Sequence, residues 1–155
     1  MDANEKALAQ QLKREQTAFL KFETLLEEES QALVSATADE LLMVVDKKAL
    51  AAEELHQLSD ERARLLQQLG VDANDVERVR EWFNQRPPKD ELTAQWNRLL
   101  EIGRSVVRRN ASNGKLIHQR LESTQESLNV LKKAAGAPEL YGRDGKIKSP
   151  FSAGY

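Results

Sequence analysis

The residue types that most often perform chemistry are scarce in this chain of 155 residues, which has no cysteine and only two histidines. Glu53 and His56 form one Glu-x-x-His pair, a spacing that supplies a carboxylate and an imidazole to di-metal centres in helical bundles. Such a centre needs a second pair, but the residue three positions before His118 is Lys115. A boundary histidine is the favoured interpretation, and no metal or other cofactor is expected.

Other catalytic patterns are missing as well. Gly142 and Gly145 lack the lysine and the flanking strand and helix of a phosphate-binding loop. No serine or threonine has a histidine and an acid suitably placed for nucleophilic catalysis. The sequence therefore predicts a protein that is not an enzyme, so its function should depend on the surfaces of its structural elements.

The composition favours long helices. The chain is 40% hydrophobic, 31% charged and only 5% aromatic, a profile that suits helical bundles better than sheets. Residues 1–13 are polar, and no apolar run approaches the roughly 18 residues that cross a bilayer. We therefore expect a cytoplasmic protein without stable membrane insertion, which the absence of cysteine also permits.

The longest pattern runs over residues 92–131, where apolar or small residues recur at alternating steps of four and three. It predicts one helix about 60 Å long, the spine of an elongated molecule. Asn110 and Asn113 occupy the same seam. Buried asparagines can fix register or oligomeric state, whereas exposed ones would mark a point where helices splay.

Two further long helices are predicted before the spine. The first covers about residues 4–35. The second follows Thr37, which forms a capping box with Glu40, and it ends at Gly70, where a residue with positive φ is favoured. The short hinge between the two helices predicts an antiparallel hairpin.

A shorter helix is predicted over residues 72–85. Asp72 is its expected N-cap, and the two prolines that follow it end it. Trp82 and Phe83 are expected to close this end of the bundle.

The charges are unevenly distributed. Residues 1–69 carry 14 acidic and 8 basic groups, whereas residues 89–135 carry 5 acidic and 9 basic groups. This asymmetry favours pairing between helices over a nucleic-acid surface, because the whole chain has a net charge of −2 and its arginine cluster at 104–109 has no interleaved aromatics. Glu15 and Glu29 interrupt the first apolar stripe and are expected to pair with a neighbouring Lys or Arg or to reach solvent.

These patterns together predict an all-α protein. Its expected architecture is an elongated antiparallel helical bundle or coiled coil of three long helices, with a short connecting helix. Residues 1–135 should form the single domain, and residues 136–155, which are interrupted by Gly and Pro, a flexible C-terminal tail. The large apolar groups of this tail make a docking segment as well supported as an inert extension.

Two motifs carry a resemblance to a known family. Asn-Ala-Ser-Asn-Gly-Lys-Leu-Ile at 110–117 lies within the spine, and Leu-Tyr-Gly-Arg-Asp-Gly at 140–145 follows it. In this arrangement the chain resembles the FlgN family of flagellar export chaperones. The resemblance covers the whole chain in architecture, while its specific residues are confined to positions 110–145.

The resemblance implies a cytoplasmic chaperone of bacterial flagellum biogenesis. Such a chaperone binds the C-terminal amphipathic segments of the hook-filament junction proteins FlgK and FlgL, prevents their premature assembly and delivers them to the flagellar type III export apparatus. Family members bind clients through their C-terminal part, which corresponds here to Ile117, Leu121, Leu128, Val130 and Leu131. We also expect Leu140 and Tyr141 to contact the export-gate protein FlhA.

Two alternatives stay open at this stage. The apolar residues at the end of the spine could pack on the first helix rather than on a client. The chain could also be a non-enzymatic coiled-coil adaptor with an unidentified partner, and the sequence does not decide whether it self-associates.

Overall fold

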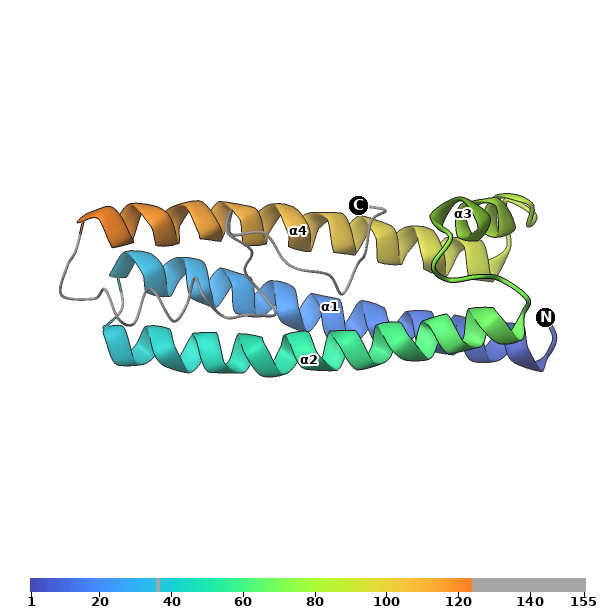
Figure 1. Cartoon of the computed structure of the whole chain (residues 1–155), viewed down its shortest axis with the longest axis horizontal. Coiled ribbons are helices and arrows are strands. Elements are labelled where there is room, and N and C mark those ends of the chain that lie inside the picture. Colours follow the sequence, from blue (N-terminus) through green and yellow to red (C-terminus); the bar gives the residue numbers. More distant parts are fainter. Residues whose placement is uncertain (36, 124–155) are drawn as a thin grey trace.

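The computed structural model describes residues 1–35 and 37–123, which fold into four α-helices without any strand. Three long helices lie side by side in an elongated bundle, and a short helix lies at one end (Figure 1). The expected fold class is therefore confirmed. The boundary expected between residues 135 and 136, and the tail beyond it, fall outside the described residues.

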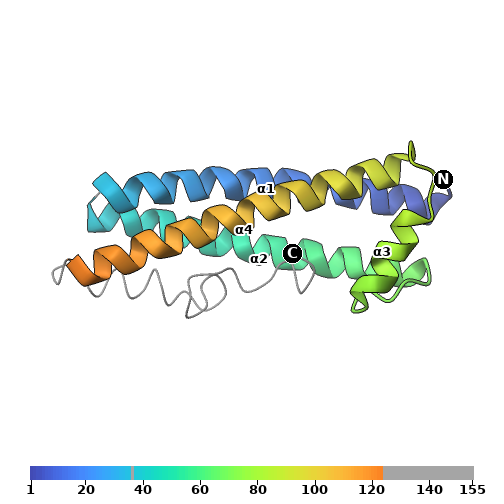
Figure 2. The same ribbon diagram turned by 90° about the horizontal axis from the view of Figure 1, so that it is seen from above.

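The first long helix, α1 (Ala3–Ser35), is the central element. It packs along both α2 (Ala38–Gln68) and α4 (Glu91–Ser123), whereas α2 and α4 rarely approach each other closely. Seen from above, α4 runs obliquely across the α1–α2 hairpin (Figure 2). Each outer helix therefore depends mainly on α1 for its burial.

The core is a continuous apolar stripe between the helices. In α1 the apolar residues recur at the steps of three and four that keep one helix face buried. The largest fully buried apolar side chains of the core are Leu8, Leu12, Phe19, Phe22, Leu26, Leu41, Leu55, Leu66, Leu92, Leu99 and Ile117.

The start and the end of α2 follow the local signals in the sequence. The Thr37 hydroxyl accepts a hydrogen bond from the Glu40 amide at 3.3 Å, and the Glu40 carboxylate accepts one from the Thr37 amide at 3.1 Å. This is the expected capping box. Gly70, after the last turn, has φ of +79°, a left-handed conformation that glycine adopts without strain.

The short helix α3 (Val76–Asn84) begins later than expected, and its N-cap is Asp75 rather than Asp72. Asp75 accepts a hydrogen bond from the Arg78 amide at 3.2 Å. Asp72 instead accepts one from the Asn74 amide, two residues on, and so closes the turn that follows α2. The prediction of Asp72 as the N-cap was wrong because its side chain serves this turn.

Aromatic rings close the end of the bundle at α3, as expected. Phe83 is buried and stacks on Trp96 of α4, with ring centroids 4.6 Å apart and an interplanar angle of 3°. Trp82 is half-buried and meets the edge of Phe83.

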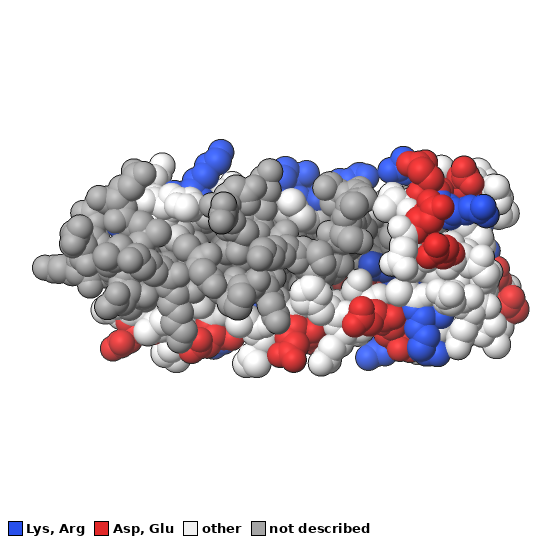
Figure 3. Space-filling view, viewed as in Figure 1, with Lys and Arg blue, Asp and Glu red and all other residues white. Residues whose placement is uncertain are grey.

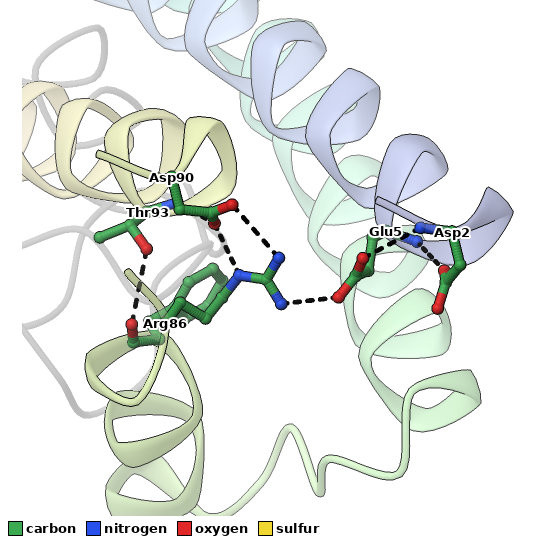
Figure 4. A network of polar contacts seen from close by, with 6 residues as sticks. Asp2, Glu5, Arg86, Asp90 and Thr93 are labelled. Atoms are coloured by element: carbon green, nitrogen blue, oxygen red, sulfur yellow. Dashed lines mark hydrogen bonds and ion pairs between the residues drawn. The ribbon is translucent and has the colours of Figure 1, made fainter. Parts of the chain in front are cut away.

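Arg86 fastens this end to the start of α1 (Figure 4). Its guanidinium donates to Asp90, with an Nε–Oδ2 distance of 2.6 Å, and to Glu5, with an Nη1–Oε1 distance of 2.7 Å. It also lies over the Trp82 ring, 4.9 Å from the centroid. One side chain thus joins the α3–α4 connection to α1.

A buried ion pair joins α1 to α2 a few turns from this end. Arg62 Nη1 donates to Glu15 Oε1 at 2.8 Å, and its guanidinium lies 5.7 Å from the centroid of the Trp96 ring. The second carboxylate oxygen of Glu15 is buried with no hydrogen-bond partner among the described residues. Burial raises the pKa of Glu15 to about 7, although the charge and hydrogen bond of Arg62 oppose this rise.

This pKa predicts a pH dependence of stability. Because the folded-state pKa of Glu15 exceeds its ordinary value of 4.5, the contribution of this group is fully present below pH 4.5 and is lost as the pH rises through 7. Between pH 5 and 7.5 the free energy of unfolding should fall by about 2 kcal/mol more in the unchanged protein than in Glu15→Gln. Urea unfolding at the two pH values measures this difference. Parallel pH profiles for the two proteins would contradict the prediction.

Candidate protein-binding site

The sequence places the candidate site at the C-terminal end of α4 and beyond. Ile117 lies within this helix with its side chain 1% exposed, so it belongs to the core of the free protein. Leu121 lies in the last described turns of the helix. The other site residues expected from the sequence, Leu128, Val130, Leu131, Leu140 and Tyr141, lie outside the described residues.

The two halves of α4 are held in different ways. In the first half the fully buried residues are apolar, namely Leu92, Leu99 and Val106. Between Val106 and Arg120 the only large apolar side chain that is fully buried is Ile117, and the other buried positions are asparagine and glycine. The half of α4 that leads to the candidate site is therefore attached to the bundle by Ile117, by the partly buried Leu116 and by polar contacts.

Those contacts form a buried polar centre, made of Glu29 from α1, Lys48 from α2, and Asn110 and Asn113 from α4. Lys48 Nζ donates to both oxygens of Glu29, at 2.9 and 3.1 Å, and to Asn110 Oδ1 at 2.6 Å. The Asn113 amide nitrogen donates to Glu29 Oε1 at 3.0 Å and to the carbonyl of Leu26 at 2.8 Å. All three long helices therefore meet in one hydrogen-bonded group.

Burial sets the electrostatics of the polar centre. The side chains of Glu29 and Lys48 are both fully shielded from solvent. Burial lowers the pKa of Lys48 to about 8, and the charge and hydrogen bond of Glu29 oppose that fall. The ammonium group is held by three hydrogen bonds and lies 6.0 Å from the centroid of the Phe22 ring. These hydrogen bonds offset the free energy that it costs to remove the two charges from water.

The sequence indicated only part of this arrangement. It predicted that Glu29 could pair with a neighbouring cation, and it placed the two asparagines on the packing seam. It did not identify Lys48 as the partner or bring the four residues together, because that requires the register of three helices. A lysine within the apolar stripe of residues 41–69 was the available signal.

Arg120 anchors the last turns of α4 to the end of α1. Its guanidinium donates to the carbonyls of Ala32 and Leu33, at 3.1 and 2.7 Å. These carbonyls lie in the last turn of α1, where backbone acceptors have no partner within the helix and a cation is favourable. Arg120 thereby places this part of α4 beside the α1–α2 hinge.

Other side chains considered from the sequence have structural surroundings. Arg109 lies 3.4 Å from Glu27 and 3.8 Å from Glu23, which supports the expected charge pairing between helices. Within residues 1–35 and 37–123, no three His, Asp or Glu side chains are grouped as metal ligands would be. In the same ranges no helix is both long and apolar enough to cross a membrane.

Comparisons with known proteins point to one family. Residues 1–149 match the sequence profile of the family described as "FlgN protein". The curated proteins named "Flagella synthesis protein FlgN" from Salmonella typhimurium strain LT2 and from Salmonella typhi are each 30% identical to this chain over 101 residues. The aligned segment covers 65% of this chain and 70% of each relative. No solved structure matches it significantly.

The polar centre makes a testable prediction about stability. Lys48→Met should lower the free energy of unfolding by about 3 to 5 kcal/mol, because it leaves the Glu29 carboxylate buried without its ammonium partner. Adding Glu29→Gln to this variant should restore part of the loss, because the neutral amide can still bond to the asparagines. Urea unfolding followed by circular dichroism measures both changes.

The matched control for this prediction is the exposed pair of Lys21 and Glu54, whose charged atoms are 3.7 Å apart. Lys21→Met should change the free energy of unfolding by less than about 1 kcal/mol. Equal losses of unfolding free energy in Lys48→Met and Lys21→Met would contradict the prediction, because the buried ion pair would then contribute no more than the exposed one.

Proposed function

This chain belongs to the FlgN family, and from that premise we propose that it is an export chaperone that acts in the cytoplasm during flagellum assembly. Its proposed clients are the hook-filament junction proteins FlgK and FlgL, and it delivers them to the export gate through FlhA. The family match over residues 1–149 and the names of the Salmonella relatives support a role in flagellum synthesis. The choice of clients and of gate protein is part of the proposal.

The observation that carries the proposal is the change in character along α4. Its first half is fixed by three fully buried large apolar side chains, whereas its second half has one, Ile117, and is otherwise fixed by the polar centre and by Arg120. Polar contacts define a position without covering much apolar surface. The helix can therefore present its C-terminal end in a fixed direction while leaving apolar residues of that segment available to a client.

The position of Arg120 adds a second argument. It contacts the last turn of α1, and α1 ends at Ser35, so α1 offers no further turn to residues that follow Arg120 in α4. Leu121 and the residues at 128–131 come after this level in the sequence. We assign them to the client and place Ile117, buried in the free protein, at the inner border of the site.

The proposed mode of binding is a helix that packs along an apolar stripe. An amphipathic terminal segment of the client lies with its apolar face on these residues and folds as it binds. The complex thereby shields apolar surface of the client that otherwise drives premature assembly of the client. Binding of this kind buries apolar area, and a negative heat-capacity change is its robust thermodynamic mark. Release requires no nucleotide if the export gate competes for the chaperone or for the client.

The client site is tested by replacing two of its leucines. Leu128→Ala with Leu131→Ala should weaken binding of a peptide from the C-terminal end of FlgK or FlgL at least tenfold, with little change in melting temperature. Calorimetric titration and thermal unfolding provide the two measurements. Leu20→Ala, at a 44% exposed position of α1, is the matched control and should leave client affinity unchanged.

The opposite result would assign the leucines to the core: equal client affinity together with a large fall in melting temperature. A folded, helical protein that binds neither peptide would contradict the chaperone proposal itself. That outcome would favour the coiled-coil adaptor.

The gate contact is tested separately. Tyr141→Ala should reduce binding to the cytoplasmic part of FlhA while client binding persists, and Tyr155→Ala serves as a control in the same segment. The two residues proposed for this contact are Leu140 and Tyr141. Unchanged FlhA binding by Tyr141→Ala, with client binding intact, would exclude Tyr141 from the gate contact.

A further inference from the structure

The outward face of α2 carries a second regularly spaced set of residues, and none of them belongs to the core. Its residues follow each other at alternating steps of four and three, and we call them the outer seam of α2. All seven are exposed: Asp39, Met43, Asp46, Leu50, Glu53, Gln57 and Asp60. The buried residues of α2, such as Val45, Lys48 and Leu55, lie on the opposite side of the helix.

The outer seam contains two of the most exposed large apolar side chains among the described residues. Met43 is 61% exposed and Leu50 is 70% exposed. They are seven residues apart, so they lie on one face of the helix, about 10 Å from each other along its axis. Exposed apolar residues that are scattered singly need no explanation, but two at heptad spacing form the pattern that helices use to pack together.

The outer seam also carries four acidic residues. They recur at intervals of seven residues, from Asp39 to Asp60. Other acids of α2 are engaged in ion pairs, Glu54 with Lys21 and Glu61 with Arg64. Glu53 and Asp60 make no ion pair or hydrogen bond within the described part of the chain. Acidic side chains gather along the α2 edge in Figure 3.

A second copy of this chain does not complement the outer seam well. The basic counterpart is the outer face of α4, where Arg104, Arg108 and Lys115 are exposed, and Figure 3 shows basic side chains along that edge. Between them Ala111 is small and half-buried, so none of these four positions offers a large apolar side chain to cover Met43 and Leu50. The two faces also lie on opposite edges of the bundle, and their contact would be of the head-to-tail kind.

We propose that the outer seam of α2 is a docking surface for a basic amphipathic helix of a partner protein. That helix has large apolar residues seven positions apart, which cover Met43 and Leu50, and Lys or Arg beside them, which face the carboxylates. The charge pattern sets orientation and register, and the apolar pair supplies the buried surface. The surface excludes residues 117–141, so it goes beyond the proposed client and gate contacts.

The test uses the full chain and a designed probe. The probe is a synthetic helical peptide with leucines at steps of four and three and lysines on both flanks, and its counterpart carries glutamates in place of the lysines. Met43→Gln with Leu50→Gln should weaken binding of the lysine peptide at least tenfold. The matched control is Leu20→Gln with Val34→Gln, two exposed apolar positions of α1, and it should bind within twofold of the unchanged protein.

The charges are tested in the same titration. Glu53→Gln with Asp60→Asn should weaken binding at least fivefold and reduce its salt dependence, whereas Glu28→Gln with Glu81→Gln, at exposed acids elsewhere, should not. The glutamate peptide should not bind. Equal affinity of all variants for the lysine peptide, or no binding by the unchanged protein, would overturn the proposal.

Two further readouts separate this proposal from others. Sedimentation should show a monomer, and a dimer that Met43→Gln with Leu50→Gln dissociates would assign the seam to a second copy and overturn the proposal. The same variant should bind the FlgK or FlgL peptide like the unchanged protein. Loss of client binding would mean that the seam is part of the client site, which also overturns the proposal while leaving the chaperone function intact.

Discussion

The arrangement of the three long helices depends on one buried hydrogen-bonded group. Glu29, Lys48, Asn110 and Asn113 satisfy one another only when α1, α2 and α4 are in the observed register. Apolar stripes alone tolerate a shift of seven residues, because leucine packs on leucine in either register. A shift here would leave a buried carboxylate and a buried ammonium without partners, which costs several kcal/mol. The main effect of the polar centre is therefore to select one register of the three helices, rather than to add to the stability of the bundle.

This constraint divides the molecule into two unlike ends. At the α3 end, the stacking of Phe83 on Trp96 and the contacts of Arg86 join α1 to the α3–α4 connection. At the hinge end, α4 is held by the buried Ile117, by the polar centre and by Arg120. The two ends of the bundle are therefore held by different kinds of contact, stacked rings and an arginine at one end and a buried polar group at the other.

The sequence was informative where the determinants are local. The capping box of Thr37 and Glu40 and the positive φ of Gly70 follow from residues that are close neighbours in the chain. The N-cap of α3 was mispredicted because Asp72 and Asp75 are both suitable caps, and the turn after α2 decides between them. The polar centre could be predicted only as separate polar interruptions, because its assembly depends on contacts across as many as 84 positions of sequence.

The charges of α4 show how one helix can serve both the fold and a surface. Arg109 and Arg120 face α1 and contact its carboxylates or terminal carbonyls. Arg108 and Arg109 are both exposed, but Arg108 makes no ion pair with α1, because one step along a helix turns a side chain by about 100°. The basic excess of this segment is thus partly paired with the acidic residues of α1. A bundle whose outer helices rarely contact each other leaves the outward faces of both exposed.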